Sequence, residues 1–152
     1  MIADRDNIRK LIDLTFDIGM QIHKDVGPGL IESVYERVLA DRMVQLGVKV
    51  KRQQPVHVEI YDKKHEDAFR YDLLLNDTLL VEIKSLEKMG PVHRKQVLTY
   101  IRLMNLPFGL LLNFGCAVFS DGMQRISNDR ATGQKRTAPP LPSLLHKIRT
   151  TE

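Results

Sequence analysis

The sequence predicts an α/β protein in which helices flank a mixed central β-sheet, with the element order α-α-β-β-β-β-α-β. Apolar residues recur at helical spacing in three segments, at about residues 4–26, 30–46 and 91–105. Between and after them, apolar residues alternate with period two or form short runs, as in strands. The 152 residues are 43% hydrophobic and 28% charged, which is typical of one ordinary globular domain.

Two predicted helices precede the sheet. The first ends at Gly27-Pro28-Gly29, because proline cannot continue a helical hydrogen-bond ladder and glycine permits a turn. The second should bury Leu30 and Ile31 together with the apolar residues that follow them at helical spacing, and it should stop at Gly47.

The strands that follow differ in how they meet solvent. Residues 48–51 and 56–60 alternate between apolar and polar, which predicts strands with one wet face, and the charged run 62–67 predicts a turn. The runs Leu73–Leu75 and Leu79–Val81 are apolar throughout and should form a hairpin covered on both faces, at the centre of the sheet.

The last third of the chain predicts one more helix and one more strand. The helix should open at Gly90-Pro91 and use Val92 among its packing residues, and residues 108–113 read as a buried strand. From Ser127 the pattern fades, so we expect a domain over residues 1–126 and a basic, proline-containing tail over residues 127–152. A short helix at Ser143–Arg149 is expected within that tail.

Composition limits the compartment and the partners. The formal net charge of +4 favours a polyanionic partner. Cys116 is the only cysteine, so the chain can form neither an internal disulfide nor a thiolate zinc cluster, which favours a reducing compartment such as the cytoplasm. The sequence has no apolar run of spanning length, so we expect no membrane partner.

Three charged residues stand out in the predicted central hairpin. Glu82 and Lys84 share one face of an otherwise apolar strand, where unpaired charge is costly, and Asp72 precedes the partner strand. One explanation is that they lie at a solvated strand end and form ion pairs with each other or with Arg70. The other is a divalent cation held by Asp72 and Glu82, with Lys84 positioning a water molecule or stabilising developing negative charge.

The length of the hairpin connection decides whether the two carboxylates can meet. A two-residue turn would pair Asp72 with Val81 and place the carboxylates on opposite faces. A three-residue connection, Asn76–Thr78, pairs Asp72 with Glu82. The metal hypothesis therefore predicts an odd connection or an equivalent bulge.

These residues resemble a known nuclease motif. Asp72 with Glu82-Ile83-Lys84 looks like the active-site motif of the PD-(D/E)XK nuclease superfamily, and residues 29–35, Gly-Leu-Ile-Glu-Ser-Val-Tyr, form a GxxExxY string. From the first helix through Ile126 the chain is similar to the GxxExxY protein family. The resemblance implies a restriction-endonuclease-like core, Mg²⁺ as cofactor with Mn²⁺ as an alternative, and a nucleic-acid substrate, with DNA favoured over RNA. In similar sites the carbonyl at the position of Ile83 also contacts the metal.

The resemblance adds helix residues to the candidate site. Glu32 matches the motif glutamate and is a candidate metal or water ligand, although the dipole of its helix would stabilise a carboxylate there anyway. Gln96 and Tyr100 lie on one stripe of the third helix with His93, and they could orient Glu82 and Lys84 or hydrogen-bond phosphate. Tyr35 shares a face with Glu32 and could contact nucleic acid or pack in the core.

Basic residues beside the third helix suggest a surface for a phosphate backbone. Lys88, Arg94 and Lys95 are the candidates, with His93 beside them, although solvated charge explains each one alone. The function these features favour is metal-dependent hydrolysis of nucleic acid, and the alternative is a non-catalytic nucleic-acid-binding or regulatory module of the same fold. A homodimer or a protein partner could supply specificity. The phosphate-binding, serine-hydrolase and dinucleotide motifs are missing from the sequence.

Overall fold

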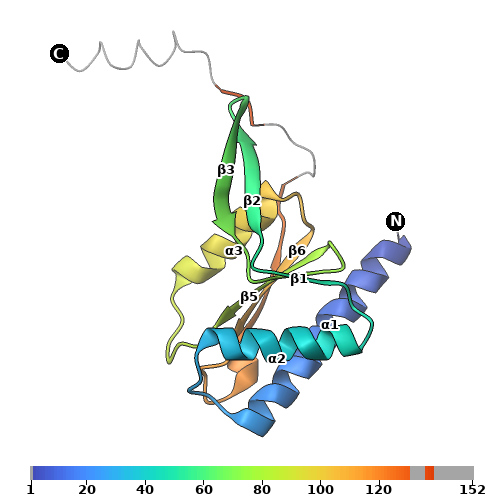
Figure 1. The fold of residues 1–152 in the computed structure, drawn as a ribbon, viewed down its shortest axis with the longest axis vertical. Coiled ribbons are helices and arrows are strands. Elements are labelled where there is room, and N and C mark those ends of the chain that lie inside the picture. Colours follow the sequence, from blue (N-terminus) through green and yellow to red (C-terminus); the bar gives the residue numbers. More distant parts are fainter. Residues whose placement is uncertain (1, 131–135, 139–152) are drawn as a thin grey trace, which may run out of the picture.

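Two layers of helices enclose a five-stranded sheet, and a separate two-stranded hairpin projects from it (Figure 1). The structure is a computed structural model that describes residues 2–130 and 136–138, with side chains described from residue 5 onward. In chain order the elements are α1 (Ile2–Val26), α2 (Glu32–Gln45), β1 (Val50–Arg52), β2 (Pro55–Ile60), β3 (Lys63–Arg70), β4 (Leu73–Leu75), β5 (Leu79–Lys84), α3 (Pro91–Leu103), β6 (Phe108–Asn113), the 3-10 helix η1 (Phe119–Gly122) and β7 (Met123–Ser127).

The main sheet is mixed and has the strand order β1-β4-β5-β6-β7. Strands β5 and β6 are parallel, and helix α3 is the crossover that this arrangement requires. The other neighbouring pairs are antiparallel. The predicted α/β class and the central position of the hairpin are thus confirmed, and strand β5 carries Glu82 and Lys84 through the middle of the sheet.

Each face of the sheet has its own apolar core. Ile12, Leu39 and Met43 of α1 and α2 pack on one face, against side chains such as Ile83. Val97 and Ile101 of α3 pack on the other face, against Leu80, Leu111 and their neighbours. Helix α3 comes close because Gly109 has no side chain, since a Cβ there would lie 2.6 Å from Val97 Cγ1. The parallel strands are therefore buried on both faces, as their apolar runs predict.

The β4–β5 register agrees with the prediction from connection length. Leu73 pairs with Val81 and Leu75 with Leu79, so the connection is the three residues Asn76–Thr78. Extending this register by one residue places Asp72 opposite Glu82. Asn76 and Asp77 make the turn with positive φ values of 50° and 55°, a conformation that these two residue types tolerate better than most.

The predicted turn over residues 62–67 is wrong. Only Tyr61 and Asp62 turn, with φ values of 53° and 61°, and the charged residues that follow belong to β3, which pairs with β2. Strand β3 is exposed at every position except Phe69, so no apolar alternation marks it in the sequence. The predicted element order therefore lacks one strand here.

The predicted order also lacks β7, the edge strand that pairs with β6. The expected boundary between residues 126 and 127 falls inside this strand. Beyond it, Asn128 donates to the carbonyls of Ile101 and Leu106, and Asp129 forms an ion pair with Arg102, so these residues pack against the end of α3. The expected terminal helix at residues 143–149 lies outside the described residues.

Some apolar residues expected in the core lie at the surface instead. Leu30 and Ile31 are 43% and 69% exposed because α2 begins only at Glu32, which leaves both in the preceding loop. Val92, near the start of α3, is 63% exposed. Within the described residues, no helix is both long enough and apolar enough to cross a membrane.

Candidate active site

Asp72 and Glu82 hold each other in place across the β4–β5 hairpin. The backbone N–H of Asp72 donates to Glu82 Oε1 at 3.2 Å, and the backbone N–H of Ile83 donates to Asp72 Oδ2 at 2.8 Å. Each carboxylate is thus fixed by the strand that carries the other. A carboxylate oxygen has two lone-pair directions, so both groups keep acceptor capacity for a cation.

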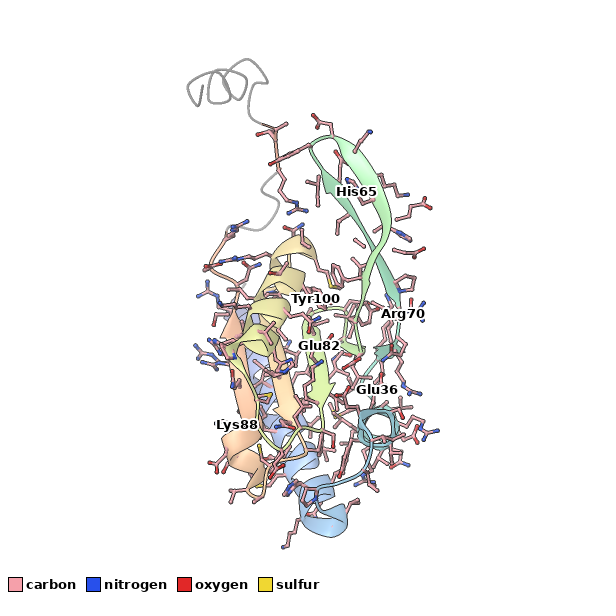
Figure 2. The ribbon with its side chains drawn as sticks, turned by 90° about the vertical axis from the view of Figure 1, so that its left-hand side faces the viewer. Glu36, His65, Arg70, Glu82, Lys88 and Tyr100 are labelled. Carbon is pink, nitrogen blue, oxygen red and sulfur yellow. The ribbon has the colours of Figure 1, made fainter. Side chains whose placement is uncertain are left out.

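Glu82 is a buried acid in the middle of the sheet, only 4% exposed (Figure 2). Burial raises its pKa to about 9, and the neighbouring charge of Asp72 adds to the rise, whereas the charge of Lys84 opposes it. Without a cation the carboxyl is therefore protonated at neutral pH. A divalent cation between the two carboxylates would stabilise the ionised form that burial disfavours.

Lys84 follows Glu82 on the same face of β5 because side chains alternate along a strand. Its side chain is half-buried, and it makes no ion pair with any other described residue. The alternative in which Lys84 is satisfied by a salt bridge with Asp72 or Glu82 therefore has no support in this geometry. Its ammonium group acts on Glu82 through space.

Asn113 fixes the end of the strand next to Lys84. It is fully buried and lies opposite Lys84 in the parallel β5–β6 pair. Its Oδ1 accepts the N–H groups of Leu86 and Gly115, and its Nδ2 donates to the Leu86 carbonyl and to Cys116 Sγ. One side chain thus ties the loop after β5 to the loop after β6, next to Lys84.

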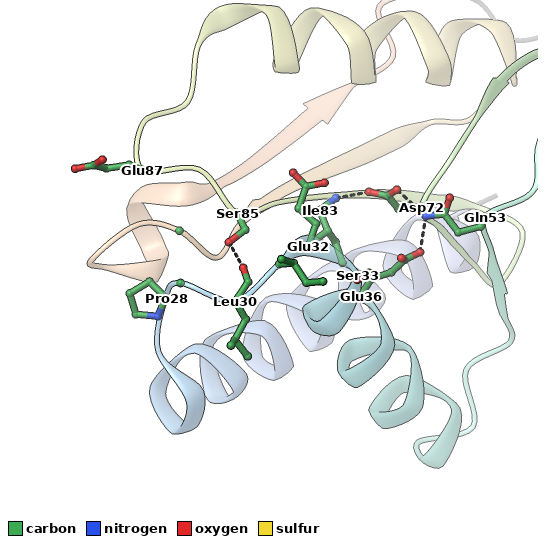
Figure 3. A pocket seen from close by; sticks show the side chains of 13 residues that line it. Pro28, Leu30, Glu32, Ser33, Glu36, Gln53, Asp72, Ile83, Ser85 and Glu87 are labelled. Carbon is green, nitrogen blue, oxygen red and sulfur yellow. Dashed lines mark hydrogen bonds between the residues drawn. The ribbon is translucent and has the colours of Figure 1, made fainter.

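Sequence reasoning missed two residues that contact this site, Gln53 and Glu36. Gln53 lies between β1 and β2, and its Nε2 donates to Asp72 Oδ1 and to Glu36 Oε1, both at 2.9 Å (Figure 3). Glu36 of α2 is 5% exposed, and burial raises its pKa, an effect to which Asp72 adds. These contacts span 19 and 17 residues of sequence, so local spacing could not reveal them.

A pocket of about 780 Å³ opens beside Asp72, between the start of α2 and the end of β5. Glu32, Glu36, Gln53 and Asp72 line it, and Figure 3 shows their side chains around it. The predicted candidate Glu32 thus shares a pocket with Asp72. Ser85, directly after β5, ties the loop before α2 to the end of this strand, because its Oγ donates to the Leu30 carbonyl at 2.5 Å.

Gln96 and Tyr100 are paired on α3, on the face of the sheet that carries Glu82. Gln96 Nε2 donates to the Tyr100 hydroxyl at 2.9 Å. Burial raises the pKa of Tyr100, and the charges of Glu82 and Asp72 contribute to the rise. Phe69 of β3 stacks on the Tyr100 ring at a centroid distance of 3.9 Å and an interplanar angle of 9°.

Tyr35 does not lie on a surface that nucleic acid could reach, so the expected contact is wrong. It is 1% exposed and stacks on Phe114 at 4.5 Å. Its hydroxyl donates to the Gly27 carbonyl at 2.5 Å and accepts the Leu30 N–H at 3.2 Å. Tyr35 therefore packs in the core and holds the loop that leads into α2.

The basic candidates lie apart from the carboxylate pair. Lys88, in the loop before α3, is exposed and well separated from Glu82 in Figure 2. Arg94 and Lys95 are exposed on α3, where Arg94 donates to Gln124 Oε1 at 3.4 Å, and His93 is half-buried. None of these four described residues forms a hydrogen bond or an ion pair with Asp72 or Glu82.

The donor set suits a hard divalent cation that keeps much of its water. Among the described residues, no three His, Cys, Asp or Glu side chains are grouped as a complete metal cage. Mg²⁺ needs no such cage, since it is usually held by one or two carboxylates together with water and substrate phosphate. Two fixed carboxylates with free acceptor capacity match that requirement.

Comparison with known proteins identifies the family. The model of the PD-(D/E)XK nuclease superfamily matches residues 9–126, which include all of the main sheet except the last residue of β7, and all the predicted site residues. The chain belongs to this superfamily. Asp72 and Glu82-Ile83-Lys84 fit the acidic and (D/E)XK parts of the motif, and Tyr71, buried beside α3, stands where the motif's name has proline.

No curated protein matches the chain. A solved structure, the crystal structure of SSO0001, is similar over 80% of this chain with 11% sequence identity and a TM-score of 0.45. The match covers 59% of that protein's length.

Proposed function

We propose that this member of the PD-(D/E)XK superfamily is a Mg²⁺-dependent nuclease, with DNA as the favoured substrate. The observation that carries the proposal is the fixed opposition of Asp72 and Glu82, with Lys84 next on the same face of β5. The GxxExxY string before and within α2 supports the narrower assignment to the GxxExxY family. Nuclease activity is typical of the superfamily, and the substrate is inferred from it.

In this proposal the acidic residues are the metal ligands. Asp72 and Glu82 would hold Mg²⁺, or Mn²⁺ in its place, with the Ile83 carbonyl as a further ligand and Glu32 acting through water. The cation would supply charge neutralisation of the phosphodiester and a water molecule of lowered pKa. Glu82 must give up its proton to bind, so cation affinity should rise with pH.

The remaining residues would bind and orient the substrate. The Lys84 ammonium is close enough to act on Glu82, so it can position the attacking water or stabilise the negative charge that develops on phosphate. Gln96 and Tyr100 offer neutral hydrogen bonds beside the carboxylates. Lys88, His93, Arg94 and Lys95 would contact the phosphate backbone, a contact that salt should weaken.

Cleavage assays on Lys84→Ala test the catalytic role. Labelled single- and double-stranded DNA and RNA would be incubated with wild type and variant, with Mg²⁺ or with EDTA. We expect cleavage by the wild type only with Mg²⁺ and a loss on the order of 100-fold in Lys84→Ala, because charge stabilisation at the phosphate is removed. Lys10→Ala, at an exposed position on α1, is the matched control and should cleave like the wild type.

Two outcomes would contradict this proposal in different ways. Equal cleavage by wild type and Lys84→Ala would remove the lysine from the mechanism. Salt-sensitive binding of DNA without any cleavage would instead favour the non-catalytic module.

A further inference from the structure

Asp72 is held at four separate points, and two of them come from one residue. Its N–H donates to Glu82 and its Oδ2 accepts from Ile83, both on β5. Its carbonyl accepts the backbone N–H of Gln53 at 2.9 Å, and its Oδ1 accepts the side-chain amide of the same residue. Gln53 therefore donates hydrogen bonds to both the backbone and the carboxylate of Asp72.

The Gln53 amide nitrogen faces two acidic side chains. Its two contacts are with Asp72 Oδ1 and Glu36 Oε1, which accept its hydrogen bonds. The amide nitrogen carries two N–H groups and can serve both acceptors at once. A neutral donor thus separates and orients two carboxylates that would otherwise repel each other.

Gln53 adopts a backbone conformation that glutamine rarely takes. Its φ is +48°, in the left-handed region that glycine and asparagine tolerate best. Strained backbone of this kind persists only where the surrounding contacts maintain it, and it often marks functional sites. Gln54, the next residue, is also an exposed glutamine, but its φ is not positive and its side chain makes no hydrogen bond with another described residue.

We propose that Gln53 is a positioning residue that presents the Asp72 carboxylate to the divalent cation, with Glu36 of α2 as its anchor. The inference rests on the proposed function, because it concerns the same cation site. Gln53 keeps one lone-pair direction of Oδ1 engaged, and Ile83 does the same for Oδ2. The carboxylate would then already be held in one orientation when the cation binds, so binding would not have to immobilise a flexible side chain.

The test compares Gln53→Met with Gln54→Met. Methionine keeps the length of glutamine but removes the N–H donors, and at position 53 it leaves the backbone conformation equally strained. Binding of Mn²⁺ would be measured by electron paramagnetic resonance, and thermal unfolding would be measured in EDTA. We expect the Mn²⁺ dissociation constant to rise about 10-fold or more in Gln53→Met and to stay within about 2-fold of wild type in Gln54→Met.

The two measurements separate positioning from a purely structural role. A lower unfolding temperature in EDTA with unchanged Mn²⁺ affinity would overturn the inference, as would equal losses of affinity in both variants. If Gln53→Met does not fold, Gln53→Gly relieves the backbone strain, removes the same donors and should show the same loss of affinity. Absence of Mn²⁺ binding by the wild type would overturn the proposed function itself, whereas wild-type binding that Gln53 variants leave unchanged would overturn only this inference.

Discussion

At the scale of single residues, the titration of Glu82 links the stability of the protein to the proposed binding of a cation. Its carboxyl loses a proton near pH 4.5 in the unfolded chain and near pH 9 in the folded one. Between these values the folded chain holds more protons, so the stability that protonated Glu82 contributes is complete below pH 4.5 and is lost as pH rises toward 9. The free energy of unfolding of the metal-free protein should therefore fall as the pH rises.

Glu82→Gln tests this dependence because the amide mimics the protonated acid without titrating. In EDTA at pH 8 we expect the variant to have a free energy of unfolding about 2 kcal/mol or more above that of wild type. The difference should vanish near pH 4.5. Urea unfolding across this pH range measures it, and Glu59→Gln at an exposed site on β2 is the control. A constant difference at every pH would show that Glu82 does not titrate as inferred.

Asn113 stabilises the fold through its hydrogen bonds to two loops. The Asn113→Ala substitution leaves two N–H groups and one carbonyl of the connecting loops without their partner in a fully buried position. We expect a loss of about 2 to 4 kcal/mol in the free energy of unfolding, measured with urea. Asn7→Ala, on the exposed side of α1, should change it by less than about 0.5 kcal/mol. Equal effects at the two positions would contradict this role.

At the scale of elements, the sequence was most informative where a segment meets the core. The apolar runs of β5 and β6 predict buried central strands, and the spacing between Asp72 and Glu82 predicts the three-residue connection. Strand β3 escaped prediction because it pairs only with β2 and is solvated on both faces, so nothing selects apolar residues there. That strand is defined only by its hydrogen bonds to β2, and such backbone pairing produces no periodic pattern of apolar residues in the sequence.

In the candidate site, too, residues marked by their local sequence were predicted, and residues brought in by tertiary packing were not. Asp72, Glu82 and Lys84 are recognisable because charge in an apolar strand is unusual. Gln53 and Glu36 carry no such mark, since a polar residue beside a loop and an acid on a helix are ordinary. Their proximity to Asp72 comes from how α2 and the β1–β2 connection pack against the sheet.

At the scale of the whole molecule, the projecting β2–β3 hairpin should be the least protected regular element. Within the described residues its strands pair only with each other, with one added bond from Arg136 Nε to the Glu59 carbonyl, whereas β5 lies between two strands and between two helical layers. We expect amide hydrogens of β3 to exchange orders of magnitude faster than those of β5, as measured by hydrogen exchange with mass spectrometry. Phe69, at the base, is the expected exception because it stacks on Tyr100. Equal protection of β3 and β5 would mean that the hairpin opens only with the whole fold.

The reciprocal bonds between Asp72 and β5 also have a meaning for how the molecule folds. They join residues only 10 and 11 positions apart, so closing the loop between them costs little chain entropy. The two acids should therefore meet as soon as the central hairpin forms, whereas the Gln53 contact must wait for a partner 19 positions away. Repulsion between the acids would then oppose an early folding step, and proton uptake by Glu82 would relieve it. Refolding of the metal-free chain is expected to be faster in mildly acidic solution than in alkaline solution.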